Sequence, residues 1–453
     1  MRSAIQNVLK FAGACGLAVL LASCGGGDST TTTITGTGLN SLGLSPAVQT
    51  AFTQADNNLR VVVKDGPHGF QLSANANVLY ATVTVCKPGG NPAIPNECVT
   101  VDNVQVDTGS VGLRVLASKV KSLNLPPVEL TSSPVTRAWE CFPFVIGGLW
   151  GQNAVADVVM GKQTATVVPV QLIEDDPKAA VQAPLDCNKA ADGNILSSDT
   201  ALGSNGILGI GSTTLDCGVG CVAGNYTNSF VQYYSCPQGA TSSAACTAAA
   251  VPANLQVYNP VAALPTRYNN GVVLKMPAVT HPGAATASGE LIFGLDSAAN
   301  NTVPVSATKV FLGVNPATDS YLNVTTVYGG RTILSSYLDT GTNGLFFTDN
   351  TLIRCNGATW YCPAKTIDAT AQISDGDNAA LNPVKVAFQI GNAEALFSTN
   401  NTAFNDAAGA TPASSASFAW GMPFFYGRNV YLSIWQQAGA LSGPWYAWTP
   451  VTQ

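Results

Sequence analysis

The chain has 453 residues, of which 46% are hydrophobic and only 10% are charged, and its formal net charge is −6. Nothing in it resembles the basic stripe with which a protein neutralises phosphates, so we expect no nucleic-acid partner. The two histidines lie beside neither a nucleophile nor a cysteine pair, which argues against Ser-His-Asp catalysis and against metal–histidine sites. We therefore expect no metal and no cofactor.

A short apolar run near the N-terminus follows Arg2 and Lys10 and ends in Leu-Ala-Ser-Cys, whose last residue is Cys24. The run is too short to cross a bilayer as a helix, and its flanks predict a signal peptide at residues 1–23. Its end resembles the lipobox of bacterial lipoproteins, in which the chain is cut before the cysteine and the cysteine is lipidated. Gly25 stands in place of the aspartate that commonly retains lipoproteins in the inner membrane, which favours the outer membrane of the cell envelope. The alternative is an ordinary secretory signal cut near Cys24.

Residues 24–46 are rich in glycine and threonine and predict a flexible tether. Beyond them, alternating apolar and polar runs such as residues 78–85 recur between turn residues, and no long amphipathic helix is evident. A body of about 400 residues can bury roughly three quarters of its unfolded surface and should divide into lobes. The sequence therefore predicts an all-β body.

Setting aside Cys15 and Cys24 leaves an even number of the 12 cysteines, as expected of disulfides in an exported chain. Local spacing suggests the pairs Cys86–Cys98, Cys217–Cys221, Cys236–Cys246 and Cys355–Cys362, which leaves Cys141–Cys187. Partners within the cluster at residues 187–246 could be exchanged, since connectivity cannot be read from sequence. No C-x-x-C motif appears, so disulfides are preferred to a zinc site.

The tripeptide Asp-Thr-Gly occurs twice, each time after an apolar residue and before a hydroxyl residue. The copies are Asp107-Thr108-Gly109, followed by Ser110, and Asp339-Thr340-Gly341, followed by Thr342. Two carboxylates that share one proton cannot both ionise, so one stays an acid while the other serves as a base. Glycine lets each turn bring its amide toward the carboxylate, and the following hydroxyl can bond the outer oxygen. The alternative for either copy is an ordinary turn at a strand end.

Three further stretches lie in a fixed order around the two copies: residues 205–211, 289–296 and 418–425. Each alone could be a buried strand with a bulge glycine. Together with the paired tripeptides, their order resembles that of the pepsin-like aspartic peptidases. In that family the first and last stretches pass behind the two catalytic loops, and the middle one closes the first lobe.

This resemblance implies a bilobal, all-β, pepsin-like fold with an active-site cleft between a first lobe at 47–298 and a second at 299–453. It implies that Thr108 and Thr340 lock the loops together, while Asp107 and Asp339 activate a water that attacks a peptide bond. The chain also resembles a bacterial lipoprotein family of undefined function that carries paired Asp-Thr-Gly motifs.

The expected function is that of an aspartic endopeptidase acting on polypeptide, held at the membrane by a lipid anchor. The alternative is a catalytically inactive surface lipoprotein that binds peptide or another ligand in the cleft, because a fold does not establish chemistry.

The chain departs from the pepsin-like family at the flap, a hairpin whose tyrosine pairs with a tryptophan shortly after the first Asp-Thr-Gly. Arg114 stands at the tryptophan position, and Phe144 falls near the tyrosine position. We assign Arg114, Phe144 and Trp150 to the cleft and flap. Arg114 near the dyad predicts ionised carboxylates and a preference for acidic substrates. The alternative is that Arg114 faces solvent or pairs with an acidic neighbour.

Overall fold

The computed structural model describes residues 56–69, 76–224, 231–313, 323–356, 359–376, 378–411, 417–435 and 444–450. Strands make up 43% of it and helices 11%, so the prediction of an all-β body is confirmed. Residues from Ala55 onward form one compact unit. The predicted signal peptide, the tether and Cys24 lie outside the described residues. Among those described, no helix is long and apolar enough to cross a membrane.

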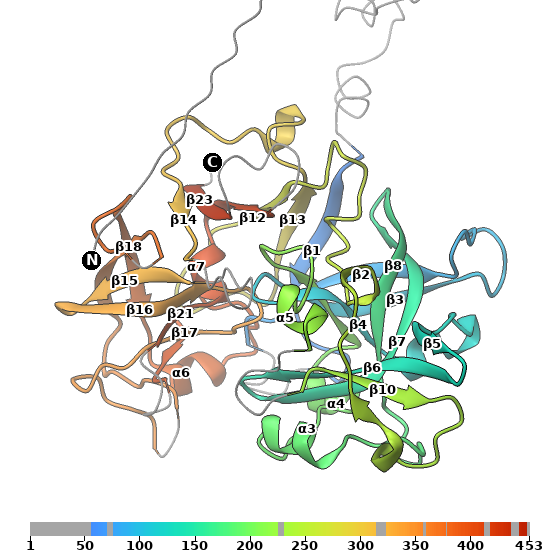
Figure 1. Cartoon of the computed structure of the whole chain (residues 1–453). Helices are drawn as coiled ribbons and strands as arrows, with labels where there is room; N and C mark the ends of the chain where they lie inside the picture. The colour runs from blue at the N-terminus through green and yellow to red at the C-terminus, as the bar shows by residue number, and fades with distance from the viewer. Residues whose placement is uncertain are drawn as a thin grey trace, which may run out of the picture. The chain divides into compact units, whose positions relative to one another are not determined.

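The larger sheet has sixteen strands, which Figure 1 shows mainly on the right and at the top. In the order of their pairing they are β11 (Thr247–Ala248), β10 (Tyr233–Pro237), β6 (Val135–Phe144), β7 (Gly147–Met160), β8 (Gln163–Ile173), β4 (Val111–Leu116), β9 (Gly206–Ile210), β3 (Cys98–Asp107), β2 (Leu79–Cys86), β1 (Asn58–Val63), β13 (Ala287–Phe293), β12 (Gly271–Met276), β22 (Arg428–Ser433), β23 (Trp445–Pro450) and β14 (Val310–Phe311), with β5 (Glu129–Ser132) beside β6.

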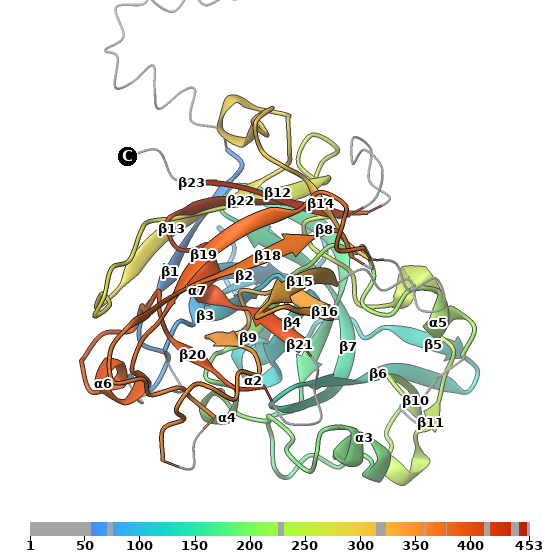
Figure 2. The same cartoon turned by 90° about the vertical axis from the view of Figure 1, so that its left-hand side faces the viewer.

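The smaller sheet has seven strands and faces the viewer in Figure 2. Their order is β19 (Val384–Ile390), β18 (Ile367–Ser374), β15 (Val324–Tyr328), β16 (Arg331–Leu338), β21 (Ser417–Trp420), β17 (Leu345–Phe346) and β20 (Ala408–Gly409).

The helices are short and connect strands. They are α2 (Ala117–Val120), η3 (Lys121–Leu123), α3 (Leu185–Ala190), α4 (Asp199–Leu202), α5 (Val219–Val222), η5 (Ser243–Ala245), η6 (Ala253–Leu255), η7 (Ala299–Asn301), α6 (Ala393–Phe397) and α7 (Met422–Phe425).

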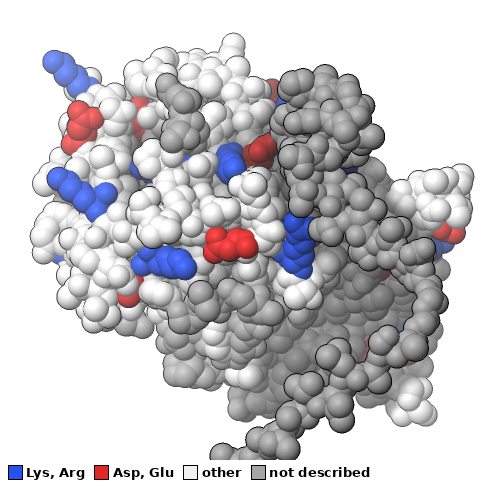
Figure 3. Space-filling model, turned by 90° about the horizontal axis from the view of Figure 1, so that it is seen from above, with Lys and Arg blue, Asp and Glu red and all other residues white. Residues whose placement is uncertain are grey.

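One hydrophobic core runs through both sheets, from Leu59 in β1 to Tyr446 in β23. Beside the smaller sheet it includes stacked aromatic rings: those of Phe347 and Phe418 have centroids 4.7 Å apart, and Trp420 stacks on Phe418 at 4.4 Å. Burial of apolar area on this scale is the main stabilising contribution to the fold. On the face in Figure 3, basic and acidic side chains are few and interspersed.

The four disulfides predicted from spacing, and the fifth pair that they leave, are confirmed. They are Cys86–Cys98, Cys141–Cys187, Cys217–Cys221, Cys236–Cys246 and Cys355–Cys362. The last pair and Glu394 lie within metal-ligand distance of one another. Sulfur atoms joined in a disulfide are not thiolate ligands, so this group does not form a metal site.

The lobe boundaries at 47–298 and 299–453 stay predictions. Strands from beyond residue 299 join the larger sheet, because β22 pairs with β12 over six residues and β23 and β14 extend it. The two predicted lobes are therefore joined by a continuous hydrogen-bonded sheet.

Candidate active site

The two Asp-Thr-Gly turns are built by the same arrangement of three strands. β3 ends at Asp107 and pairs in parallel with β9, while β4, beyond the turn, pairs antiparallel with β9. Likewise, β16 pairs in parallel with β21, and β17, beyond the second turn, pairs antiparallel with β21. The stretch 205–211 therefore contains β9, which lies between the strands before and after the first turn, and 418–425 contains most of β21, which does the same at the second turn. The stretch 289–296 overlaps β13.

Each turn needs glycine because it approaches the aspartate of the other turn. A Cβ atom on Gly109 would lie 2.7 Å from Cγ of Asp339, and one on Gly341 would lie 2.7 Å from Oδ1 of Asp107. A larger residue at either glycine would push the loops apart, since real Cβ contacts are not so short. The structure therefore brings the two carboxyl groups together.

Reciprocal hydrogen bonds between Thr108 and Thr340 join the two loops. The amide of Thr108 donates to Oγ1 of Thr340 at 3.1 Å, and the amide of Thr340 donates to Oγ1 of Thr108 at 3.1 Å. The two hydroxyls donate onward, to the carbonyl of Leu338 at 3.3 Å and to that of Val106 at 2.8 Å. Both threonines are buried. Because each hydroxyl is used as acceptor and donor, the relative position of the loops is closely fixed.

Each carboxylate is also held within its own turn. The amide of Gly109 donates to Oδ1 of Asp107 at 2.7 Å, and the Ser110 hydroxyl donates to Oδ2 at 2.5 Å. The second turn repeats this pattern, with Gly341 bonded to Oδ1 of Asp339 at 2.7 Å and Thr342 to Oδ2 at 2.6 Å. The structure thus gathers all eight residues that the sequence analysis assigned to the dyad and its support.

Burial raises the pKa of Asp339 well above its usual range, and the charge of Asp107 and a hydrogen bond to it raise this pKa further. The hydroxyl of Thr342 and the amide of Gly341 oppose the shift. The pair therefore favours a state with one shared proton, in which one carboxyl group is an acid and the other a base.

Two side chains that the sequence analysis missed also bond to these loops. The Tyr446 hydroxyl donates to the carbonyl of Leu338 at 3.0 Å, and Nε2 of Gln105 donates to the carbonyl of Gly341 at 3.1 Å. Gln105 could have been suspected from the sequence, because it is a polar residue just before Val106 and Asp107. Tyr446 could not, because it lies in β23, the last described strand, far from both turns in the sequence.

Arg114 requires a correction. Its guanidinium is buried and pairs with Glu140 at 2.8 Å and with Asp216 at 3.1 Å, and it covers the ring of Phe142 with Cζ 3.8 Å from the centroid. It also donates to the carbonyl of Val111. The prediction that Arg114 recognises acidic substrates is therefore wrong, because its charge is already neutralised by acids of this chain.

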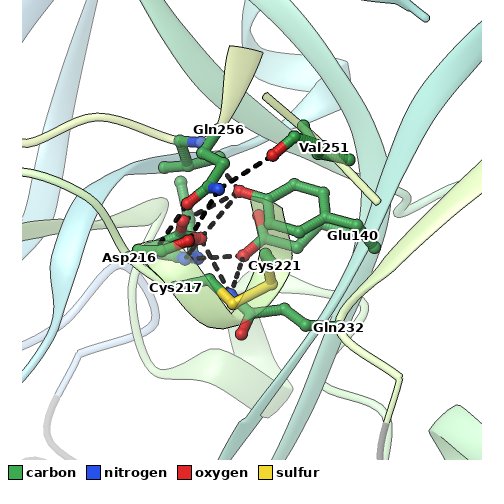
Figure 4. Close-up of a disulfide and its surroundings, with 11 residues drawn as sticks. Glu140, Asp216, Cys217, Cys221, Gln232, Val251 and Gln256 are labelled. Carbon is green, nitrogen blue, oxygen red and sulfur yellow. Dashed lines mark hydrogen bonds and ion pairs between the residues drawn. A yellow bond between two sulfur atoms is a disulfide. The ribbon is translucent and has the colours of Figure 1, made fainter. Parts of the chain in front are cut away.

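Burial alone would lower the pKa of Arg114, but Glu140 and Asp216 outweigh it and raise this pKa. The pKa of Asp216 is well above its usual range because of burial and of Glu140. Figure 4 shows Glu140, Asp216 and Gln232 meeting beside the Cys217–Cys221 disulfide, and Gln232 bonds both acids, at 3.2 and 3.0 Å. One guanidinium thus faces two buried acids, and Asp216 favours its protonated form.

Trp150 also requires a correction. It is buried, its indole stacks on Trp139 at 5.3 Å and meets Tyr234 edge-on at 5.2 Å, and its Nε1 donates to the carbonyl of Val181. Trp150 is a core residue because its ring packs against two aromatic side chains and its indole nitrogen bonds a backbone carbonyl inside the protein. Phe144 ends β6 and is partly buried, next to an exposed hairpin tip formed by Val145 (85% exposed) and Ile146 (66% exposed).

Comparisons with known proteins give a family and a similar solved structure. The family model described as "Protein of unknown function (DUF3443)" matches residues 53–448. No curated protein matches the chain. Among solved structures, the chain is similar to the crystal structure of aspartic proteinase from Irpex lacteus, with 15% identity and a TM-score of 0.49, over 87% of this chain and 97% of that one.

Proposed function

We propose that this chain, which belongs to the DUF3443 family of proteins of unknown function, is an aspartic endopeptidase that hydrolyses peptide bonds in extended polypeptides. One observation carries the proposal: two Asp-Thr-Gly turns face each other, joined by reciprocal threonine hydrogen bonds, with the pKa of Asp339 raised by burial and by Asp107. An ordinary pair of strand-end turns would not need to bury two carboxyl groups against each other, because that arrangement is costly.

In the proposed reaction, Asp339 carries the proton that the pair shares, and Asp107 acts as the base. Asp107 takes a proton from a water molecule as its oxygen attacks the peptide carbonyl carbon, and Asp339 donates its proton to the carbonyl oxygen. The resulting tetrahedral diol collapses when one of its hydroxyls returns a proton to Asp339 and Asp107 gives the amide nitrogen the proton that it took from water. The C–N bond breaks, and the products are a carboxylic acid and an amine. No covalent enzyme intermediate forms.

The test is cleavage of a peptide library by the wild type and by the Asp107→Asn and Asp339→Asn variants. Asparagine keeps the shape but cannot share or transfer the proton, so we expect each single change to lower turnover at least about 1,000-fold with the fold intact. A statine inhibitor, which mimics the diol, should block the wild type. Asp65→Asn, at an exposed carboxylate, is the control.

Cleavage that survives in the double asparagine variant would place the chemistry elsewhere. Peptide binding without cleavage by the wild type would instead support the alternative of an inactive binding protein.

We also propose that the mature protein is anchored through a lipid on Cys24, on the outer membrane. The lipobox-like end of the apolar run supports this, and Gly25 favours the outer membrane. Cys24→Ser should abolish lipid labelling and either release soluble protein or leave an unprocessed precursor. Unchanged labelling of the variant would contradict the anchor at this residue, and Cys15→Ser is the matched control.

A further inference from the structure

Arg114 reaches back to the Asp-Thr-Gly turn that precedes it in the chain. Its Nη1 donates to the carbonyl of Val111, the residue that directly follows Ser110. The hydroxyl of Ser110 in turn donates to Oδ2 of Asp107. Both Arg114 and Ser110 are buried. The carbonyl that Arg114 holds is therefore next in the chain to a residue whose side chain bonds the first carboxylate.

The same guanidinium is bonded to two segments outside the turn. Its Nη2 donates to Glu140 in β6 at 2.8 Å and to Asp216 at 3.1 Å, and none of these three side chains has exposed surface. The ring of Phe142, also in β6, covers the guanidinium. β6 forms a hairpin with β7, and Asp216 adjoins the Cys217–Cys221 disulfide (Figure 4). Arg114 therefore joins the first turn to this hairpin and to the loop that the disulfide closes.

A buried tyrosine holds the acid end of this network against the exit of the turn. The hydroxyl of Tyr233 donates to Asp216, whose two carboxylate oxygens lie 2.8 and 3.0 Å away, and accepts from the amide of Val257 at 2.8 Å. The side chain of Val257 fills the space beside Gly112, where a Cβ atom would lie 2.1 Å from its Cγ1. The network thus contacts the exit of the turn at both Val111 and Gly112. We call four side chains the Arg114 network: Arg114, Glu140, Asp216 and Tyr233.

We propose that Arg114 is a positioning residue of the dyad: the Arg114 network holds the first turn against the second, close enough for Asp107 and Asp339 to share one proton. A guanidinium binds several acceptors in a fixed planar geometry, and its hydrogen bonds are stronger than those between neutral groups. An apolar side chain would fill the same space without the cost of burying charged groups. The kinetic consequence of this inference rests on the proposed function, whereas the shared proton can be measured without it.

The test is denaturant unfolding of the oxidised mature chain, and it measures the gain in stability that Asp339→Asn brings between pH 4 and pH 7. Burial, the charge of Asp107 and a hydrogen bond to Asp107 raise the pKa of Asp339 and so produce this gain. In an Arg114→Lys background the turn loses its planar partner, the contribution of Asp107 weakens, and the gain should fall to about half. Burial and the charge of Asp339 raise the pKa values of Tyr337 and Tyr446, so these neighbours stay neutral over this range. Stability lost by both members of each pair cancels in the difference.

Tyr233→Phe takes the place of Arg114→Lys if the lysine variant does not fold, and it should also reduce the gain. Tyr361→Phe is its matched control. The hydroxyl of Tyr361 is also inside the protein, donates to the carbonyl of Phe347 at 2.6 Å and accepts from the amide of Asp349 at 3.0 Å, but it bonds neither Asp-Thr-Gly turn. We therefore expect Tyr361→Phe to lower the free energy of unfolding at every pH and to leave the gain unchanged.

Kinetics give a second measurement if the wild type cleaves peptides. Arg114→Lys should then lower kcat about tenfold with KM within about twofold, and the two limbs of the pH–rate profile should move toward each other because the carboxyl groups interact less. A wild type that shows the gain but cleaves nothing would refute the proposed function and leave the positioning role intact. The positioning role is overturned if the wild type shows no gain, or if the gain is undiminished in Arg114→Lys, or in Tyr233→Phe where the lysine variant does not fold.

Discussion

At the scale of single residues, the buried carboxyl group of Asp339 makes the free energy of unfolding depend on pH. Its pKa is raised above the usual unfolded value of about 3.9. Between that value and the folded pKa, the folded protein holds a proton that the unfolded chain releases. The free energy of unfolding contributed by this group is therefore largest below pH 4 and falls as the pH rises through this window.

We accordingly expect Asp339→Asn to gain stability relative to the wild type as the pH rises from 4 to 7. The gain should be about 1.4 kcal/mol for each unit by which the pKa is raised. Denaturant unfolding at several pH values measures it, with Asp65→Asn, an exposed site, as the control. A difference between variant and wild type that stays flat over this range would contradict a raised pKa at Asp339.

The dyad could be predicted from the sequence because its chemistry is local. Asp107 and its three supporting residues are consecutive, and so are Asp339 and its own. The bond from Tyr446 to the carbonyl of Leu338 could not be predicted, since the two residues are 108 positions apart and neither has an unusual local pattern.

At the scale of elements, Arg114 connects three segments that are distant in the sequence. It lies in β4, directly after the first Asp-Thr-Gly turn, and pairs with Glu140 of β6 and with Asp216 beyond β9. These partners are 26 and 102 residues away, so the sequence could not name them. An arginine inside the apolar run Val-Gly-Leu-Arg-Val-Leu does indicate that an acid must meet it, because an unpaired buried charge is unstable.

We expect Arg114→Met to lower the free energy of unfolding by about 3 kcal/mol or more, because it leaves Glu140 and Asp216 buried without their cation. Adding Glu140→Gln and Asp216→Asn should recover part of the loss, because these changes remove the two buried acid groups that Arg114 balanced. Denaturant unfolding at pH 7 compares these variants with Arg354→Met, at an exposed arginine. If Arg114→Met were as stable as that control, the network would contribute nothing to the fold.

At the scale of the whole molecule, the sequence pattern predicts the β architecture but not the strand pairing that joins the two predicted lobes. The alternating runs indicated β structure, and the repeated motif indicated two similar halves. The sequence did not show that β22, β23 and β14 complete the larger sheet. Such pairing depends on register between strands that are more than a hundred residues apart, for example Val272 opposite Leu432.

This shared sheet leads to a prediction about unfolding. The pairing of β12 with β22 runs from Gly271 opposite Ser433 to Met276 opposite Arg428, and the core spans both sheets. Neither predicted lobe can lose its strands without exposing backbone groups and apolar surface of the other. We therefore expect the oxidised mature chain to unfold in one cooperative transition, although chains of this length often unfold in several.

Scanning calorimetry tests this expectation through the ratio of calorimetric to van't Hoff enthalpy, which should be close to one. A fragment ending at residue 298 provides the comparison: it retains β12 but lacks β22, so β12 becomes an open edge, and we expect the fragment to aggregate or to show no cooperative transition. Two resolved transitions in the whole chain, together with a fragment that melts at the temperature of one of them, would show that the halves are independent folding units despite the strands they share.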